Sequence, residues 1–473
     1  MKYLFGLALI IFSSLQLLAQ QDTSYFDSGK KKYYTNDYVG AADDFSKAID
    51  INPEYTKAYI FRGIAYFEQK EYQKAITDQT KAIDLNDQLA HPYNERGKAK
   101  IASKDVDGSI KDFLKAIELD SSYSYAFFNL ANVKLFALKK VRDAIKTFTV
   151  AINLNSSDSK SYMNRGYARS LTENYYGAIA DYNQAIFLDP KSAKAYNNRG
   201  LTKASMLNFE AAIPDFSEAI KLDSEYTNAY YNRGMARFRN ADYLEAIKDI
   251  EKVIVLDGQS IKAHTKLGDI KYLLKDYPEA VMHYSKAIAI DPKNALLINN
   301  RGYAFLKQKK YDEAVSDFDK AIELKPNFSY AYNNRGFTKM ELKQYKKAIE
   351  DFNKTLEIDS AHYEALYNRA KCKLNTGEYQ SGYEDIDASL TLNKENEAAY
   401  MLRGQLLVHL KKYEKALKDL NRYIGNHKSG DAFYYRCVAR FNLTKTELAC
   451  RDLASAEKLG FEKNDDLSIP ICQ

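Results

Sequence analysis

Arginine and aspartate side chains recur in this chain in a fixed register, and such a set could bind anions or form ion pairs within the fold. The register follows a glycine that returns about every 34 residues. Arginine stands directly before that position in ten units: Arg62, Arg96, Arg165, Arg199, Arg233, Arg301, Arg335, Arg369, Arg403 and Arg436. Aspartate stands fifteen residues after it in eleven units: Asp44, Asp78, Asp112, Asp181, Asp215, Asp249, Asp317, Asp351, Asp385, Asp419 and Asp452.

The exceptions indicate which charges belong together. One unit carries Leu130 in place of arginine and Thr147 in place of aspartate, and another carries Leu267 and His283. Because both charges vanish together, we expect the partners to lie in the same unit. An arginine fork binds a carboxylate through two parallel hydrogen bonds. We therefore interpret the two columns as structural ion pairs: Arg62–Asp78, Arg96–Asp112, Arg165–Asp181, Arg199–Asp215, Arg233–Asp249, Arg301–Asp317, Arg335–Asp351, Arg369–Asp385 and Arg403–Asp419.

The functional alternative is that the arginines form a basic stripe for phosphate or acidic ligands. The first unit has Ser28 where others have arginine, so Asp44 needs another donor. We expect Arg62 to supply it.

Asparagine forms a second column, two residues before the glycine. It comprises Asn129, Asn164, Asn198, Asn232, Asn300, Asn334 and Asn368, and aromatic residues stand beside it at Tyr167, Tyr231, Tyr303, Phe337 and Tyr367. A primary amide offers two donors and one acceptor, which matches a peptide group. These residues are the candidate peptide-binding groove. The alternative is that the amides cap local backbone or meet water.

The sequence offers no chemistry for catalysis or for a cofactor. Nucleophile-elbow, zinc-protease, phosphate-loop and dinucleotide motifs do not occur. The six histidines are scattered, so we expect no metal site. We predict that the protein is not an enzyme and needs no cofactor. The four cysteines are Cys372, Cys437, Cys450 and Cys472, and their spacing alone does not choose a pairing.

The glycine column shows which elements position these residues. It contains Gly29, Gly63, Gly97, Gly166, Gly200, Gly234, Gly268, Gly302, Gly336 and Gly404, with Ala131, Ala370 and Cys437 as substitutes. Apolar residues at helical spacing flank a polar break in each unit, which predicts two antiparallel helices. We expect Gly302 and Ala314 to let the two helices approach closely. The pattern predicts an all-α solenoid of about thirteen units over residues 22–457, with one extra residue near Lys139–Arg142 in the fourth unit.

This pattern resembles the tetratricopeptide repeat over nearly the whole chain, as in Ala178, Tyr182, Ala185 and Pro190 of the fifth unit. The resemblance implies a right-handed superhelical solenoid whose first helices line a concave face. It places the asparagine column on that face, similar to the asparagine ladder of O-linked N-acetylglucosamine transferases. The implied function is a non-catalytic scaffold that binds an extended protein segment. Binding of carbohydrate or peptidoglycan, or a structural role in an envelope complex, is the alternative.

The two ends of the chain predict export. Lys2 precedes an apolar stretch from Leu4 to Ala19, which reads as a cleaved signal peptide of residues 1–19. The protein is then expected in the periplasm or cell envelope, or secreted, with no transmembrane segment after cleavage. The alternative is an uncleaved membrane anchor, although the stretch is shorter than the roughly 20 apolar residues that a spanning helix needs. Its net charge of +6 is spread along the chain, so nucleic acid is not an expected partner.

Residues 458–473 are the expected C-terminal cap, with Gly460 as a helix stop. Their sequence resembles the end cap of exported tetratricopeptide proteins of Bacteroidetes-type bacteria. That resemblance implies a Cys450–Cys472 disulfide, and Cys437–Cys450 is the competing pair.

Overall fold

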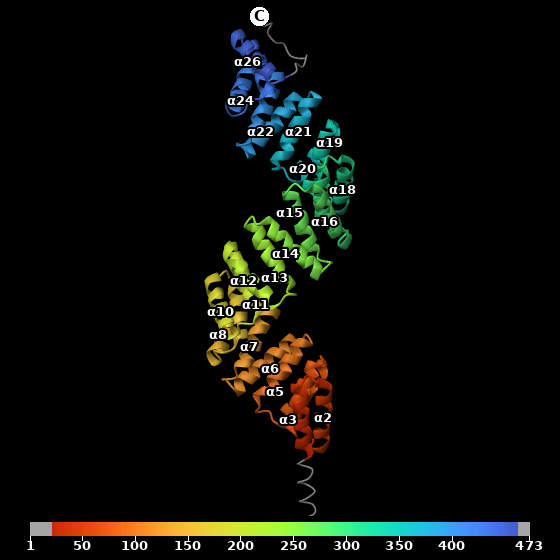
Figure 1. The fold of residues 1–473 in the computed structure, drawn as a ribbon, viewed down its shortest axis with the longest axis vertical. Helices are drawn as coiled ribbons and strands as arrows, with labels where there is room; N and C mark the ends of the chain where they lie inside the picture. Colours follow the sequence, from red (N-terminus) through yellow and green to blue (C-terminus); the bar gives the residue numbers. More distant parts are fainter. Residues whose placement is uncertain (1–20, 462–473) are drawn as a thin grey trace, which may run out of the picture. The chain divides into compact units, whose positions relative to one another are not determined.

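Residues 21–461 are described by the computed structural model, and every regular element in that range is helical (Figure 1). The chain divides into two compact units, Met1–Asp249 and Ile250–Gln473. The signal peptide expected at residues 1–19 lies outside the described residues, as do residues 462–473 of the expected C-terminal cap.

The helices alternate between a first and a second helix of each repeat. The first helices are residues 21–34, α3 (Thr56–Glu68), α5 (Ala90–Ala102), α7 (Ser124–Asn132), α9 (Ser159–Ser170), α11 (Ala193–Ser205), α13 (Thr227–Arg239), α15 (Ile261–Leu273), α17 (Ala295–Lys307), α19 (Ser329–Glu341), α21 (Tyr363–Thr376), α23 (Glu397–His409) and α25 (Gly430–Asn442). The second helices are α2 (Tyr38–Ile51), α4 (Tyr72–Leu85), α6 (Val106–Leu119), α8 (Val141–Leu154), α10 (Tyr175–Leu188), α12 (Phe209–Leu222), α14 (Tyr243–Leu256), α16 (Tyr277–Ile290), α18 (Tyr311–Leu324), α20 (Tyr345–Ile358), α22 (Tyr379–Leu392), α24 (Tyr413–Asn426) and α26 (Thr446–Lys458). The predicted all-α solenoid is confirmed.

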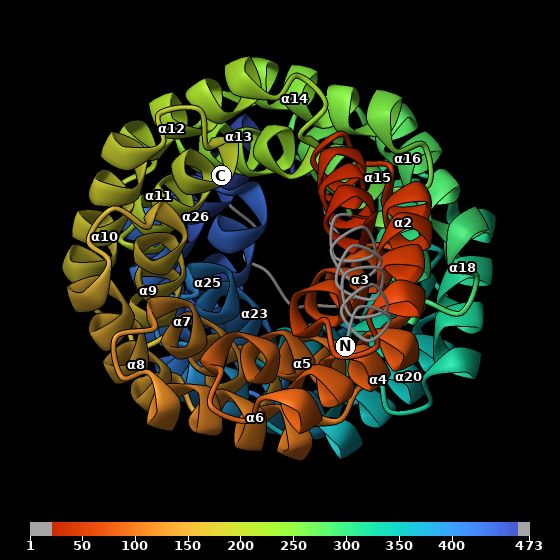
Figure 2. The same cartoon turned by 90° about the horizontal axis from the view of Figure 1, so that it is seen from below.

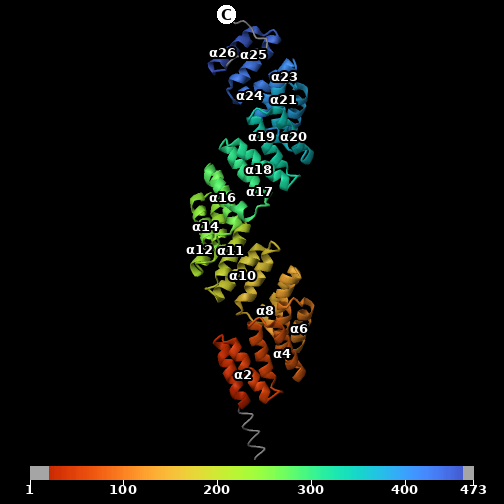
Figure 3. The same ribbon diagram turned by 90° about the vertical axis from the view of Figure 1, so that its right-hand side faces the viewer.

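Each of the two compact units stacks these helix pairs into two layers. In the N-terminal unit the first helices α5, α7, α9 and α11 lie on the inner side and α6, α8, α10 and α12 on the outer side (Figure 2). In the C-terminal unit the helices labelled from α16 to α26 follow one another along the stack in chain order (Figure 3). Within each of the two compact units, second helices also contact the first helix of the following repeat, as α16 contacts α17 and α20 contacts α21. Stacking therefore covers the apolar face that a single pair would leave open.

In seven repeats the glycine leaves room for an aromatic ring on the second helix. A Cβ atom at Gly302 would lie 2.9 Å from Cε1 of Phe318, and one at Gly97 would lie 2.7 Å from Cε1 of Phe113. Both rings are buried, at 0% and 1% exposure. The close approach predicted from Gly302 and Ala314 is thus made mainly by the glycine and the ring.

The fourth repeat takes its extra residue inside the first helix. In twelve repeats the residue seven after the glycine position has a positive φ, as Lys309 does at 60°, but here the equivalent residue is Lys139, eight after Ala131. The segment Val133–Ala137 between them is a π-helix, and the Leu138 amide bonds the Val133 carbonyl five residues back. A π-turn holds one more residue than an α-turn. The expected position at Lys139–Arg142 is therefore wrong.

The last described helix ends where the sequence predicts. Helix α26 ends at Lys458, and Gly460 follows with a φ of 75°. A left-handed residue suits glycine because it has no Cβ atom. Phe461 then stacks on Tyr434 of α25, with 4.5 Å between the ring centroids. This contact covers part of the apolar face of the last repeat.

Candidate functional site

All ten arginines of the repeated column bind the aspartate of their own repeat through two hydrogen bonds. Nε bonds one carboxylate oxygen and Nη2 the other, at 2.5 to 3.2 Å, in the nine predicted pairs and in Arg436–Asp452. The aspartates are 3–7% exposed. Each pair joins the first and second helix of one repeat.

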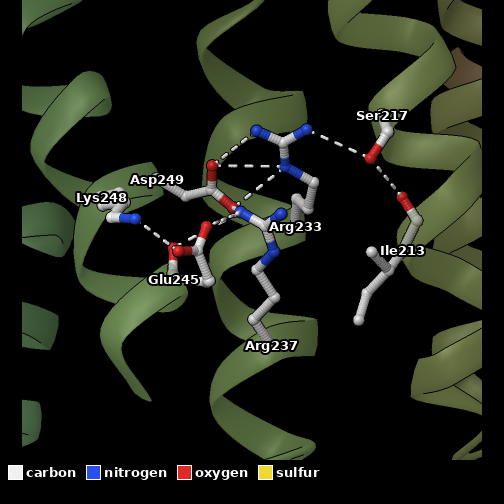
Figure 4. A network of polar contacts seen from close by, with 7 residues as sticks. All are labelled: Ile213, Ser217, Arg233, Arg237, Glu245, Lys248 and Asp249. Atoms are coloured by element: carbon white, nitrogen blue, oxygen red, sulfur yellow. Dashed lines mark hydrogen bonds and ion pairs between the residues drawn. The ribbon is translucent and has the colours of Figure 1, made fainter. Parts of the chain in front are cut away.

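The same arginines also bind the preceding repeat, a contact that the sequence interpretation missed. In Figure 4, Nη1 of Arg233 on α13 donates to Oγ of Ser217 on α12 at 3.1 Å. Nη1 makes the equivalent contact in every case, with Ser46, Thr80, Thr149, Asn183, Ser217, Ser285, Asp319, Asn353, Asp387 and Asn421. All ten acceptors stand about sixteen residues before their arginine. A search for polar residues at that spacing could have found them.

A second cation contacts the aspartate in most repeats. Figure 4 shows Arg237 beside Arg233, and its Nη1 lies 2.7 Å from Asp249. The equivalent residue, three after the glycine, bonds the aspartate in eight repeats through Lys32, Lys100, Arg169, Lys203, Arg237, Lys339, Lys373 and Arg440. The second repeat has Tyr66 there, and the ninth has Phe305.

One column of tyrosines packs on the arginines. The Arg62 guanidinium lies 5.4 Å from the ring centroid of Tyr59, three residues earlier, and Arg96 lies at the same distance from Tyr93. Such contacts stabilise a cation over an aromatic face. The arginine side chains are 11–25% exposed. Their guanidinium groups are engaged within the fold, which leaves no free basic stripe along this column.

In the first and fourth repeats, which lack the arginine, the residue of the aspartate column finds its partners within its own repeat. Asp44 accepts from Oγ of Ser28 at 2.6 Å and pairs with Lys32 at 2.7 Å. The expectation that Arg62 serves Asp44 is wrong, because Arg62 bonds Asp78 and Ser46. In the fourth repeat Lys134 donates to Thr147 at 2.9 Å.

The asparagine column lies on the first helices, but most of its amides bond asparagines that stand outside the column. Asn129 donates to Asn94 at 2.9 Å, Asn164 to Asn132 at 2.8 Å, Asn232 to Asn197 at 2.9 Å and Asn334 to Asn299 at 3.0 Å. Asn198 and Asn300 accept from the asparagines directly before them, at 3.5 and 3.4 Å. Asn368 is 8% exposed. Four of the seven predicted groove amides therefore tie one repeat to the preceding one.

The aromatic residues of the predicted groove mostly pack between helices. Tyr167 stacks on Phe136 at 6.0 Å, and the Tyr303 ring lies 5.6 Å from that of Tyr272. Phe337 packs against two core clusters and Tyr367 against a third. Burial raises the pKa of Tyr367. Tyr231 is half-buried, so Tyr167, at 38% exposure, is the most accessible of the five.

Two adjoining cavities open among the first helices of the N-terminal unit. The first, of about 510 Å³, is mainly apolar, and the second, of about 580 Å³, carries more polar groups. Lys57, Ile60, Phe61, Gln88, Leu89, Ala90, Leu119 and Asp120 line the first alone. Asn94, Glu95, Lys98, Tyr125, Phe128, Asn129, Asp158 and Lys160 line the second alone. His91 and Tyr123 line both cavities, which we call together the α3–α9 cleft.

The charges of the α3–α9 cleft are balanced. Glu95 is 9% exposed, accepts from Asn94 at 2.9 Å and pairs with Lys98 at 2.6 Å. Burial raises the pKa of the Tyr123 hydroxyl and lowers that of the His91 imidazole, so both groups are neutral near pH 7. Tyr125 is 59% exposed at the second cavity. The cleft thus offers apolar surface, amides and a paired carboxylate without a dominant charge.

The state of the three cysteines within the described residues excludes one of the two expected disulfide pairs. Cys372 and Cys437 are buried free thiols, and Cys450 is disulfide-bonded. The competing pair Cys437–Cys450 is therefore wrong, whereas Cys472 lies outside the described residues. Burial raises the pKa of the Cys372 thiol to about 12 and that of Cys437 to about 11, so both stay protonated at neutral pH.

Neither a metal centre nor a membrane span is found over residues 21–461. No group of three or more histidine, cysteine, aspartate or glutamate side chains in this range is placed to hold a metal ion. None of the helices in the same range is long and apolar enough to cross a bilayer.

Comparison with known sequences identifies repeats along most of the chain. Models described as tetratricopeptide repeat match residues 26–90, 90–123, 193–226, 227–259, 295–328 and 318–350. A model described as TPR repeat matches residues 172–206 and 268–309. A model described as anaphase-promoting complex, cyclosome, subunit 3 matches residues 341–423. No curated protein matches the chain.

Three solved structures illustrate what the chain is similar to. The MamA protein is 27% identical over 36% of this chain and 92% of its own, with a TM-score of 0.34. A tetratricopeptide repeat protein from Parabacteroides merdae is 19% identical over 50% of this chain and 94% of its own, with a TM-score of 0.40. The anaphase-promoting complex Cut9–Hcn1 hetero-tetramer is 14% identical over 95% of this chain and 96% of the matched chain, with a TM-score of 0.42.

The matches to repeat-family models and the alternating helix pairs indicate the same protein family. The chain belongs to the tetratricopeptide repeat family, whose solenoids act as protein-interaction scaffolds.

Proposed function

We propose that this protein is a non-catalytic scaffold that binds an extended protein segment in the α3–α9 cleft. The observation that carries the proposal is the adjacency of the two cavities. An apolar cavity takes an apolar side chain, and the neighbouring amides and carboxylate offer partners to peptide groups. The balance of charges in the cleft favours the neutral backbone of a peptide over a polyanion.

The α3–α9 cleft occupies only part of the inner face over which the sequence predicts the binding groove. Of the predicted groove residues only Asn129 lines a cavity described here, although Tyr167 is also accessible. The remaining asparagines and aromatic residues bond or pack within the solenoid. We propose that the main role of these residues is to make the binding face rigid. A rigid face loses little conformational entropy of its own when it binds a segment.

Site-specific photo-crosslinking in the native organism tests the proposal. A photoreactive amino acid replaces Tyr125, which lines the second cavity and is 59% exposed. The control replaces Tyr176 on the second helix α10, which is 79% exposed. We expect a protein adduct from position 125 and a much weaker one from position 176, with the adduct identified by mass spectrometry.

The outcomes separate the competing functions. Protein adducts from position 176 alone would favour a structural subunit held by its outer surface and contradict binding in the cleft. An adduct of cell-wall glycan at position 125 would favour the carbohydrate-binding alternative. Titration of the purified protein with soluble peptidoglycan fragments then measures that binding directly.

We further propose that the protein is exported to the periplasm or cell envelope. The support is the predicted signal peptide of residues 1–19. N-terminal sequencing of protein isolated from the envelope fraction is expected to begin at Gln20. A chain that begins at Met1 in the cytosolic fraction would contradict both cleavage and export.

A further inference from the structure

The eighth repeat replaces the ion pair of the other repeats by two buried histidines. His264 on α15 stands four residues before Gly268, where seven of the arginine-bearing repeats have tyrosine. His283 on α16 stands in the aspartate column, and Leu267 takes the place of arginine. His264 is 4% and His283 is 8% exposed.

The two imidazoles contact each other directly. Their Nδ1 atoms lie 3.3 Å apart, and the ring centroids lie 5.6 Å apart with 33° between the planes. One Nδ1 must carry the hydrogen while the other accepts it. A neutral pair satisfies this requirement. If both imidazoles are protonated, both Nδ1 atoms are donors and the hydrogen bond is lost.

The surroundings oppose a positive charge at this pair. Lys271 on α15 and Lys286 on α16 both disfavour protonation of His283. Glu279 is the carboxylate near His283, but it lies 3.8 Å from Nε2 and is 44% exposed. Its attraction is therefore screened by water. One contact acts the other way: the backbone of Gly258 hydrogen-bonds His264, which raises the pKa of that imidazole, but burial and Lys286 together lower it more.

The other charged groups on the packed helices are engaged elsewhere. Asp269 on α15 bonds Lys266 and Tyr284, and Asp276 lies 3.6 Å from Lys271. On α17, which packs against α16, Arg301 bonds Ser285 and Asp317. No described carboxylate therefore compensates a charged histidine pair as Asp317 compensates Arg301.

We propose that the His264–His283 pair is an acid-sensitive joint, which holds α15 against α16 at neutral pH and opens this repeat selectively in mild acid. The ten arginine-bearing repeats keep their pairs at the same pH, because guanidinium groups stay charged and the carboxylates are stabilised by them.

The sign of the effect follows from proton linkage. Burial, followed by His264 and the lysines, lowers the pKa of His283 to about 4, and burial lowers that of His264 as well. The open state binds protons more readily, with a histidine pKa of about 6.5. The contribution of the pair is complete above that value and is lost as the pH falls from about 6.5 toward 4. At pH 5 the opening constant should rise roughly 30-fold from His283 alone.

Hydrogen exchange of the mature full-length protein at pH 7.5 and pH 5.0 tests the proposal. After correction for intrinsic exchange rates, the opening constant of α15–α16 peptides should rise at least roughly 30-fold on acidification. Peptides of α17–α18, which carry Arg301–Asp317, are the internal control and should change by less than roughly 3-fold. An equal response in both pairs of helices would overturn the proposal.

Two variants test whether the histidine pair causes the selective response of α15–α16 to acid. The triple variant His264→Tyr, Leu267→Arg and His283→Asp restores the side chains found in the neighbouring repeats and should remove the selective response. The single variant His283→Asn, a neutral amide of similar size, should reduce it even if the triple variant folds poorly. Persistence of the selective response in either folded variant would contradict the assignment.

Direct titration provides a readout that does not depend on folding of variants. Imidazole nitrogen chemical shifts of the wild-type protein should show His283 neutral in the native state at pH 5.0. A native His283 that titrates near pH 6.5 would also overturn the proposal.

Discussion

Replacement of Arg62 by methionine is expected to lower the local free energy of unfolding of α3–α4 by about 3–5 kcal/mol, the range for breaking a buried ion pair. Asp78 is 4% exposed and accepts both of its ionic hydrogen bonds from Arg62, at 2.8 Å each. Position 66 is tyrosine, so no second cation from the described residues contacts Asp78. The variant leaves a buried carboxylate without compensation.

Hydrogen exchange of α3–α4 peptides is the appropriate measurement, because long repeat arrays do not unfold in one cooperative step. Arg165→Met is the matched control. Asp181 keeps Arg169, whose Nη1 lies 2.8 Å from Oδ2, so the expected loss is about 1.5–3 kcal/mol, the value of hydrogen bonds to charged groups. Equal losses in the two variants would show that the second cation does not matter.

The loss caused by Arg62→Met also includes the packing of Arg62 on Tyr59, whose ring centroid lies 5.4 Å from the guanidinium.

Replacement of Gly97 by valine is expected to cost about 3 kcal/mol or more, at the upper end of overpacking effects. The first added carbon would lie 2.7 Å from Cε1 of Phe113, and that ring is 1% exposed. Gly425→Val on α24 is the control for valine in a helix, because a Cβ there meets nothing within 4 Å. Hydrogen exchange of α5–α6 and α24 peptides compares the two variants.

The double variant Gly97→Val with Phe113→Ala tests the cause. If the ring is what the glycine accommodates, the double variant should be more stable than the sum of the single losses predicts, by about 1–3 kcal/mol. The chain itself contains such an exchange, since the repeat that has Ala370 in the glycine column has Ile386 in place of the ring. Strictly additive losses would contradict a direct contact.

The sequence was sufficient to predict the fold because the same pattern of small, apolar and polar residues returns along the repeats. Gly302, Ala314 and the polar break between them predict one helical hairpin, and a hairpin with an open apolar face must stack on another. The joint loss of charge at Leu130 and Thr147 also predicted that each arginine meets the aspartate of its own repeat. Covariation within a repeat reports a contact that does not depend on the curvature of the stack.

The tertiary structure decided how neighbouring repeats meet. The bond from Arg233 to Ser217 links side chains on consecutive helices of two repeats, and the sequence register alone does not give that distance. The same holds for Asn232, predicted as a ligand for peptide, which donates to Asn197 of the preceding repeat. A free amide and a bonded one look identical in sequence.

What the sequence by itself determined is therefore the repeat, its two helices and the ion pair inside it, because these depend on spacing within about 34 residues. Only the tertiary structure placed the extra residue in the π-helix Val133–Ala137, opened the α3–α9 cleft and brought His264 against His283. These features depend on how side chains of separate helices fill shared space, and close packing settles that only once the helices have been brought together.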